Sequence, residues 1–126
     1  DLFHIGHLNM IKTAKEYCEY LIVGVHGDDV VEGYKNHLPI INENDRKRII
    51  ESVKGVDRAE INRFRDKIKL WELYHFDVIF IGDDWKGTER WNHFEKVLAE
   101  INVDVVYVPY TQGISTTDIK KRILKS

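Results

Sequence analysis

The hydrophobic and polar positions of this chain alternate between two patterns. Four segments have the apolar character of strands: residues 20–25, 56–61, 77–81 and 103–108. Five segments show apolar residues at helical spacing: residues 7–17, 46–53, 66–74, 91–101 and 119–123. Three polar residues are suited to cap the helices that follow them: Asn44, Thr88 and Ser115. The stretch 26–43 is polar and contains glycines and a proline, so it predicts a loop.

Strands that alternate with helices predict an α/β fold. We expect a Rossmann-like doubly wound parallel sheet in a single domain that spans residues 1–126. Ligands of such sheets bind beyond the carboxyl ends of the strands, in the loops that follow them. The first helix-entry loop begins at Asp1 with no strand before it, so we expect the first strand to lie upstream of this sequence.

Composition narrows the function classes. Of 126 residues, 43% are hydrophobic and 32% are charged, and the net charge is −2, which gives no basic footprint for nucleic acid. No apolar run approaches the roughly 20 residues that a membrane-spanning helix needs. The single cysteine allows no internal disulfide. We therefore expect a soluble, cytoplasmic protein that binds no nucleic acid and does not insert into a membrane.

The first chemical motif is His4-Ile5-Gly6-His7 at a helix start. Two imidazoles three residues apart lie on one side of the helix, and Gly6 lets a phosphate approach the backbone. The free N–H groups and the dipole of a helix start favour an anion. The simpler interpretation is a pair of surface histidines near a cap, so this motif alone is weak evidence.

The second motif is Gly113-Ile114-Ser115-Thr116-Thr117, which opens the last helix. Hydroxyl groups and helix-start amides bind phosphate oxygens, although Ser115 can also be an ordinary cap. Two such helix starts in one small α/β chain favour a triphosphate as the ligand.

The third motif, Gly82-Asp83-Asp84-Trp85, follows the strand at 77–81. A carboxylate of Asp83 or Asp84 can accept hydrogen bonds from a base or ribose, and Trp85 can form a pocket wall. The same four residues would also fit a polar turn that binds no ligand and in which the Trp85 ring only packs against the protein.

Isolated charged residues carry less information. Lys35, expected in a loop, and Arg46, expected at a helix start, are both suited to bind phosphate. The acidic residues Asp28 and Asp29 are interpreted as a solvated surface, and His26 as a surface or packing residue, because no metal-ligand spacing includes it.

Together these motifs resemble the cytidylyltransferase family of the HxGH nucleotidyltransferase superfamily, and within it the bacterial glycerol-3-phosphate cytidylyltransferases. The likeness covers nearly the whole chain, with residues 1–7, 82–85 and 113–117 in the family's order and spacing. It implies transfer of a cytidylyl group from CTP to a phosphorylated small molecule such as glycerol 3-phosphate or another polyol or amino-alcohol phosphate, with release of pyrophosphate. It also implies Mg²⁺ bound mainly through the triphosphate, and no metal site formed by the protein itself.

The resemblance implies roles for particular residues. His4 and His7 would stabilise the transition state at the α-phosphate, and Lys35 would bind phosphate. The remaining residues are assigned to nucleotide binding: Asp1, Gly6, Arg46, Asp83, Asp84, Trp85, Gly113, Ile114, Ser115, Thr116 and Thr117. A homodimer is expected from the resemblance and from Trp91, because we expect one small core to cover only part of its ring.

Two departures leave the acceptor open: the family's arginine and glutamate before the Gly-Ile-Ser-Thr-Thr motif are Tyr110 and Gln112 here. Three alternatives to a cytidylyltransferase also stay open. They are an adenylyltransferase that uses ATP on a sugar phosphate or FMN, a non-catalytic nucleotide-binding module, and a fragment of an aminoacyl-tRNA synthetase. The last is disfavoured by the absence of a Lys-Met-Ser-Lys-Ser motif and of a basic surface.

Overall fold

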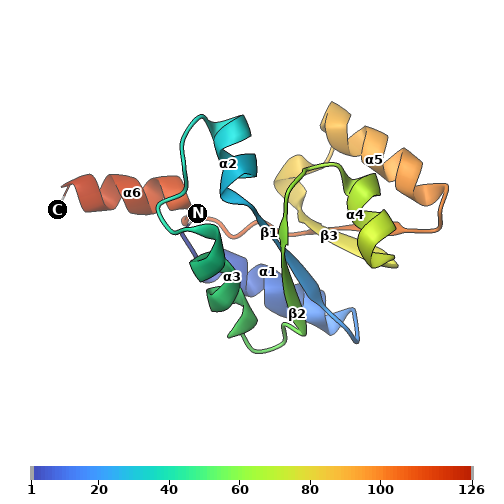
Figure 1. The fold of residues 1–126 in the computed structure, drawn as a ribbon. Helices are drawn as coiled ribbons and strands as arrows, with labels where there is room; N and C mark the ends of the chain where they lie inside the picture. The colour runs from blue at the N-terminus through green and yellow to red at the C-terminus, as the bar shows by residue number, and fades with distance from the viewer. Residues whose placement is uncertain (1, 126) are drawn as a thin grey trace. The chain divides into compact units, whose positions relative to one another are not determined.

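A computed structural model describes residues 2–125, and Figure 1 shows its helices and strands. In chain order these are α1 (Ile5–Glu16), β1 (Ile22–His26), α2 (Asp28–Lys35), α3 (Glu43–Glu51), β2 (Arg58–Asn62), α4 (Lys67–Tyr74), β3 (Val78–Gly82), the short 3₁₀ helix η1 (Asp83–Trp85), α5 (Glu89–Ala99), β4 (Asp104–Val108) and α6 (Thr116–Lys125). The chain divides into two compact units, one of residues 1–65 and 111–126 and the other of residues 66–110.

The first unit is built on a parallel strand pair. β1 and β2 pair in register from Ile22 opposite Arg58 to His26 opposite Asn62. Side chains on a strand alternate between its two faces, so the buried residues Val25 and Ala59 lie on the face that α3 covers. Both strands therefore end at the same edge, where His26 and Asn62 lie side by side.

The second unit holds the best-defined apolar core. β3 and β4 pair in parallel from Val78 opposite Asp104 to Gly82 opposite Val108. Helix α5 packs on this pair because Trp91, Phe94 and Leu98 recur at helical spacing, and Leu98 is fully buried. The loop Gly82–Trp85 begins where β3 ends.

The predicted α/β class with parallel strands is confirmed, and within the described residues the four strands form two separate parallel pairs. Thr88 and Ser115 cap helices as predicted, since their hydroxyl oxygens accept the N–H groups of Trp91 and Asp118. The predicted cap Asn44 is wrong, because Asn42 accepts the N–H of Asp45 and α3 begins earlier.

The prediction of a loop throughout residues 26–43 is also wrong, because α2 occupies Asp28–Lys35. Gly33 is tolerated inside this short helix, and the helix ends at Asn36, whose φ of 61° is left-handed. Lys35 is therefore in the last helical turn and not in a loop. The predicted partial exposure of Trp91 is wrong as well, since this ring is only 2% exposed.

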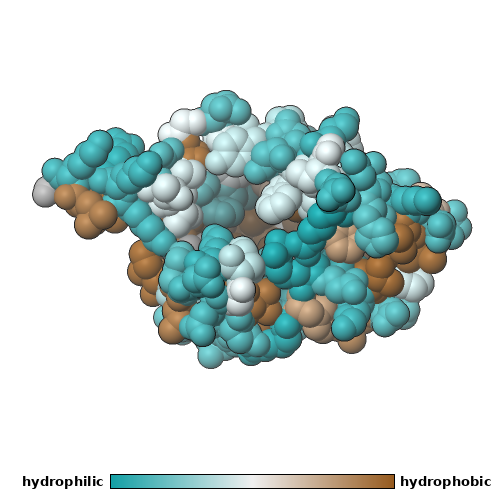
Figure 2. Space-filling model, turned by 90° about the horizontal axis from the view of Figure 1, so that it is seen from above, coloured by the Kyte–Doolittle hydropathy of each residue, from teal (hydrophilic) through white to brown (hydrophobic). Residues whose placement is uncertain are grey.

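Exposed apolar side chains are found on the last helix. Figure 2 shows apolar atoms on α6, at the left of that view, and Ile123 and Leu124 are its exposed apolar residues. Among the described residues, no helix is long and apolar enough to cross a membrane.

Candidate active site

The start of α1 is fixed by its two histidines. His4 is the capping residue, with extended backbone angles, and its Nδ1 accepts the N–H of Gly6 at 3.0 Å. His7 Nδ1 in turn accepts the N–H of His4 at 3.2 Å. The two rings lie 4.1 Å apart between centroids, and Phe3 stacks on His7 at 5.7 Å. Each ring thus satisfies one N–H group that a helix start otherwise leaves unbonded.

These two hydrogen bonds determine which ring nitrogen carries the proton. A backbone N–H can only donate, so both Nδ1 atoms must be acceptors without hydrogen. In a neutral imidazole the proton then lies on Nε2. Both Nε2–H groups are therefore donors that the caps do not use, and they are available to an anionic ligand.

The surroundings of the rings keep them neutral. Burial is the largest cause that lowers the pKa of His7 to about 4, and the neighbouring imidazole of His4 and the positive charge of Lys35 lower it further. Burial also lowers the pKa of His4. At neutral pH both residues therefore act as uncharged donors at Nε2.

Gly6 is required by the capping ring. A Cβ atom at residue 6 would lie 2.8 Å from Cε1 of His4, closer than real Cβ contacts. The same position faces Thr111, whose Cβ would be 3.6 Å away. The glycine of the motif thus makes room for the folded-back imidazole, a reason that the sequence analysis did not identify.

The second predicted helix start lies against the first. Asn9 of α1 donates a hydrogen bond to the Thr111 hydroxyl at 3.3 Å, and the Thr116 hydroxyl donates to the Leu2 carbonyl oxygen at 3.4 Å. Gly113 has a φ of +80°, a left-handed conformation that glycine adopts without strain and that turns the loop into α6. The structure therefore brings together the starts of α1 and α6, although 102 residues separate Asn9 from Thr111.

Two helix starts of this kind concentrate positive potential. The N–H groups of a first helical turn point outward with the positive end of the helix dipole. Here they are joined by two Nε2–H donors and by hydroxyl groups of the 115–117 segment. This donor-rich arrangement is suited to several phosphate groups of one ligand.

The two predicted cations differ in their surroundings. The positive charge of Lys35 is one of the smaller causes that lower the pKa of His7, and its ammonium lies 5.7 Å from the centroid of the Tyr34 ring. Arg46 instead donates from Nη2 to Asp28 at 2.6 Å and from Nε to the Ile41 carbonyl oxygen at 2.9 Å, and its side chain is 12% exposed. These contacts hold the start of α3 to the start of α2, so a contact of Arg46 with a nucleotide stays a prediction.

The interpretation as a solvated surface is wrong for Asp28, whereas Asp29 is exposed as expected. Asp28 and Glu43 each accept the backbone N–H of the other residue. Arg63, which follows β2, forms ion pairs with Glu43 and Asp29. This network joins two helix starts to a strand end. Arg63 stands directly after a predicted strand, and a search of the residues after that weaker strand would have found it.

His26 is also more than an isolated surface residue. Its Nδ1 lies 3.3 Å from the hydroxyl of Tyr34 on α2, and the rings meet edge to face at 5.8 Å. The sequence analysis did not consider Tyr34, because it placed this residue in a loop.

The third motif belongs to the other unit. Asp83 accepts the backbone N–H of Tyr110 at 3.0 Å, which ties the end of β3 to the segment after β4. Asp84 is exposed, and Trp85 is 38% exposed. Of the two carboxylates, Asp84 is the one that this tie leaves unused. Binding of a nucleoside by Asp83, Asp84 and Trp85 stays a prediction.

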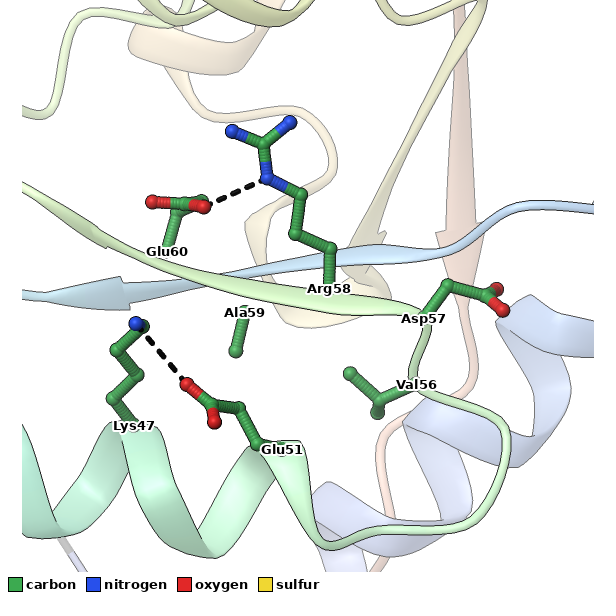
Figure 3. Close-up of a pocket in the computed structure, with 7 residues that line it drawn as sticks. All are labelled: Lys47, Glu51, Val56, Asp57, Arg58, Ala59 and Glu60. Carbon is green, nitrogen blue, oxygen red and sulfur yellow. Dashed lines mark hydrogen bonds and ion pairs between the residues drawn. The ribbon is translucent and has the colours of Figure 1, made fainter.

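A pocket on the first unit contains none of the predicted residues. It lies at α3 and β2, and Figure 3 shows the residues that line it: Lys47, Glu51, Val56, Asp57, Arg58, Ala59 and Glu60. Lys47 pairs with Glu51 at 3.1 Å and Arg58 pairs with Glu60 at 2.7 Å, on opposite sides of the strand in the figure. These paired charges leave no set of converging donors, so the helix starts are the better candidate site.

The predicted site residues are distributed as follows. The first unit contains His4, Gly6, His7, Lys35, Arg46, Gly113, Ile114, Ser115, Thr116 and Thr117, and the second contains Asp83, Asp84 and Trp85. Asp1 lies outside the described residues. Among the described residues, no group of three or more His, Cys, Asp or Glu side chains could hold a metal ion.

A parallel α/β fold with this pair of helix starts defines the class of the protein as a nucleotidyltransferase, and comparison with known proteins agrees. The chain belongs to the cytidylyltransferase-like family, whose model matches residues 1–122. The resemblance recognised from the three motifs is therefore confirmed.

Individual relatives differ in their named activities. The chain is 37% identical to a glycerol-3-phosphate cytidylyltransferase of Bacillus spizizenii, over 96% of this chain and 88% of that protein. It is 33% identical to an FAD synthase of Korarchaeum cryptofilum, over 99% and 86%. Among solved structures it is similar to a lipopolysaccharide core biosynthesis protein of Thermoplasma volcanium, with a TM-score of 0.72, 28% identity and 88% of each chain covered.

The pKa of His7 generates a prediction about pH. In the folded protein the Hε1 signal of His7 should not move between pH 8 and pH 5, because its pKa is lowered from 6.5 to about 4. The unfolded chain takes up this proton near pH 6.5, so the contribution of His7 to stability is present above that pH and declines as the pH falls toward 4. Proton NMR titration of the folded and urea-unfolded protein measures both; a folded-state midpoint near 6.5 would contradict the neutral ring.

The geometry at Gly6 generates a second prediction. Gly6→Ala should displace the His4 ring and lower turnover by roughly tenfold or more, because Nε2 of His4 loses its position. The free energy of unfolding should change by less than about 1 kcal/mol, since alanine favours the helix by about as much as the lost cap favoured it.

Gly33→Ala is the matched control, because Gly33 is also helical and nothing lies within 4 Å of its Cβ position. This variant should be slightly more stable and fully active. Chemical denaturation and steady-state assays compare the two variants. If Gly6→Ala and Gly33→Ala had equal turnover, the position of the His4 ring would not contribute to catalysis.

Proposed function

We propose that this protein transfers a cytidylyl group from CTP to a phosphorylated small molecule, with glycerol 3-phosphate or a similar polyol or amino-alcohol phosphate as acceptor. The products are a CDP-linked compound and pyrophosphate. The observation that carries the proposal is the contact between the starts of α1 and α6, with two Nε2–H donors next to them. The family and the 37% identical relative support CTP as the donor.

The proposed step is an in-line displacement. An oxygen of the acceptor phosphate attacks the α-phosphorus of CTP, and the bond from that phosphorus to the bridging oxygen of pyrophosphate breaks. The attacking phosphate is ionised near neutral pH, so no strong base is required, and catalysis consists of positioning and charge stabilisation.

In this proposal each group of donors has a separate task. The Nε2–H groups of His4 and His7 donate to oxygens of the α-phosphate, where negative charge is redistributed in the transition state. The amides at Ser115, Thr116 and Thr117 and the hydroxyls of Ser115 and Thr117 hold the β- and γ-phosphates, while the Thr116 hydroxyl donates to the Leu2 carbonyl oxygen. The ammonium of Lys35 neutralises charge between donor and acceptor. Asp83, Asp84 and Trp85 are assigned to the nucleoside.

Magnesium is part of the proposal as a partner of the triphosphate. The donors at the two helix starts are N–H and O–H groups, which bind phosphate oxygens and not a cation. These residues therefore fit a metal that the triphosphate itself holds. When bound, Mg²⁺ supplies charge neutralisation on the leaving pyrophosphate.

A second candidate uses ATP in place of CTP. The 33% identity to an FAD synthase supports adenylyl transfer to FMN, and Tyr110 and Gln112 depart from the motif of glycerol-3-phosphate cytidylyltransferases. The helix starts bind phosphates that both nucleotides share, so they do not distinguish the two bases.

Two further expectations belong to this proposal. A homodimer is expected on the family resemblance alone, because the buried ring of Trp91 removes the second argument for it; light scattering of the full-length protein measures it. A cytoplasmic location is expected as well.

Pyrophosphate release by the full-length protein tests the reaction. CTP and ATP are each combined with Mg²⁺ and with glycerol 3-phosphate, phosphoethanolamine or FMN. We expect release with CTP and an alcohol phosphate, and none with FMN. Release only with ATP and FMN would favour the second candidate, and release with no pair would contradict both.

Replacement of His7 tests its role. His7→Ala should lower kcat by roughly a hundredfold or more, because one donor to the transition state is lost. The dissociation constant for CTP should change much less, since that interaction strengthens mainly in the transition state. Stopped assays and calorimetry provide the two constants.

Two amide side chains at residue 7 test whether a neutral donor at the position of Nε2 is enough for activity. Glutamine can place an N–H near the position of Nε2, whereas the shorter asparagine cannot reach it. A neutral donor therefore predicts more activity for His7→Gln than for His7→Asn. His93→Ala, at an exposed residue of α5, is the control and should be fully active. Unchanged turnover in a folded His7→Ala protein would leave only a capping role.

A further inference from the structure

Four side chains meet at the end of β1, outside the two helix starts. His26 is the last residue of β1, Tyr34 and Lys35 form the last turn of α2, and Arg65 follows β2. The guanidinium carbon of Arg65 lies 4.2 Å from the centroid of the Tyr34 ring, and Nζ of Lys35 lies 5.7 Å from it. We refer to these residues as the Tyr34 platform.

The platform places two positive charges on one aromatic ring. Cations are attracted to the face of a ring within about 6 Å, which offsets part of their mutual repulsion. None of the ion pairs among the described residues involves Lys35. The ring itself is held by the contact of its hydroxyl with His26 and is 38% exposed. This pre-formed positive surface is therefore accessible to a ligand.

The platform lies on the side of the site where an acceptor is needed. Lys35 belongs to the platform, its positive charge also lowers the pKa of His7, and the platform and the α1 start belong to the same unit. It stands beyond the carboxyl ends of β1 and β2, where parallel sheets bind ligands. The α6 start, which the proposal gives to the triphosphate, meets α1 through different residues, Asn9 and Leu2.

We infer that the Tyr34 platform is the acceptor subsite, and that Arg65 together with Lys35 selects an acceptor without a positive charge, a polyol phosphate over a phosphorylated amino alcohol. The inference rests on the proposed function and narrows its acceptor. An exposed tyrosine ring would attract the ammonium group of an amino alcohol. Here a guanidinium already occupies that ring, so an ammonium would meet two like charges, while the phosphate of either acceptor is attracted.

The test compares acceptors that differ in charge. Glycerol 3-phosphate, phosphoethanolamine and phosphocholine are each offered to the full-length protein with CTP and Mg²⁺. We expect kcat/KM for glycerol 3-phosphate to exceed that for either amino-alcohol phosphate by at least about tenfold. In Arg65→Gln the KM for glycerol 3-phosphate should rise and this preference should shrink by roughly tenfold, with the KM for CTP unchanged.

Two variants separate charge from structure. Arg65→Lys retains the charge and should keep the preference. Arg122→Gln, at an exposed arginine of α6, removes a charge elsewhere and should change nothing. If Arg65→Gln keeps the wild-type preference, or if the wild type prefers an amino-alcohol phosphate, the inference is wrong.

Direct binding distinguishes this failure from a failure of the proposed function. Calorimetry with each acceptor alone needs no turnover. A protein that releases no pyrophosphate but binds glycerol 3-phosphate more tightly than phosphocholine, and loses this difference in Arg65→Gln, would retain the subsite and overturn the reaction. Equal binding of the two acceptors would overturn the subsite whatever the activity.

Discussion

The hydrogen bonds that close the start of α1 are the constraint on which the rest of the candidate site depends. His4 Nδ1 accepts from Gly6 and His7 Nδ1 accepts from His4, so one pair of bonds both caps the helix and sets the tautomer of each ring. The caps use both Nδ1 atoms, so the Nε2–H groups are left for a ligand. Burial lowers both pKa values and keeps the rings in the form that the caps need. A protonated Nδ1 would lose the cap, so structure and chemistry require the same neutral state.

The candidate active site forms where the start of α1 meets the loop before α6, two segments that are far apart in the sequence. The hydroxyls of Thr111 and Thr116 join the last loop to Asn9 and Leu2, so the starts of α1 and α6 present their donors together. Lys35 adds a charge from a third helix, and the Tyr34 platform adds a second charge beside it. The proposed function assigns a separate task to each group: amides and hydroxyls would bind phosphates of the donor nucleotide, neutral imidazoles would face the reacting phosphate, and cations would receive the acceptor.

Local signals predicted well where one residue decides the outcome. Thr88 and Ser115 cap helices, as expected of hydroxyl residues that directly precede apolar residues at helical spacing. The His-x-Gly-His motif likewise predicted a helix start. Prediction failed where tertiary contacts overrode local preference. Helix α2 forms in spite of Gly33, and ion pairs join Asp28 and Asp29 at its start to Arg46 and Arg63, partners 18 and 34 residues away. The contact between the Tyr34 ring and the Arg65 guanidinium could not be predicted for the same reason, because the two residues are far apart in the sequence and meet only in the folded protein.

A crystal structure of the full-length protein with CTP and Mg²⁺ tests the central claim most directly, namely that neutral histidines at a capped helix start hold the α-phosphate. The account predicts Nε2 of His4 and of His7 within about 3.2 Å of oxygens of the α-phosphate. It also predicts that both Nδ1 caps stay intact and that the β- and γ-phosphates lie at the start of α6. A triphosphate bound away from both rings, or rings turned so that Nδ1 faces the phosphate, would contradict it.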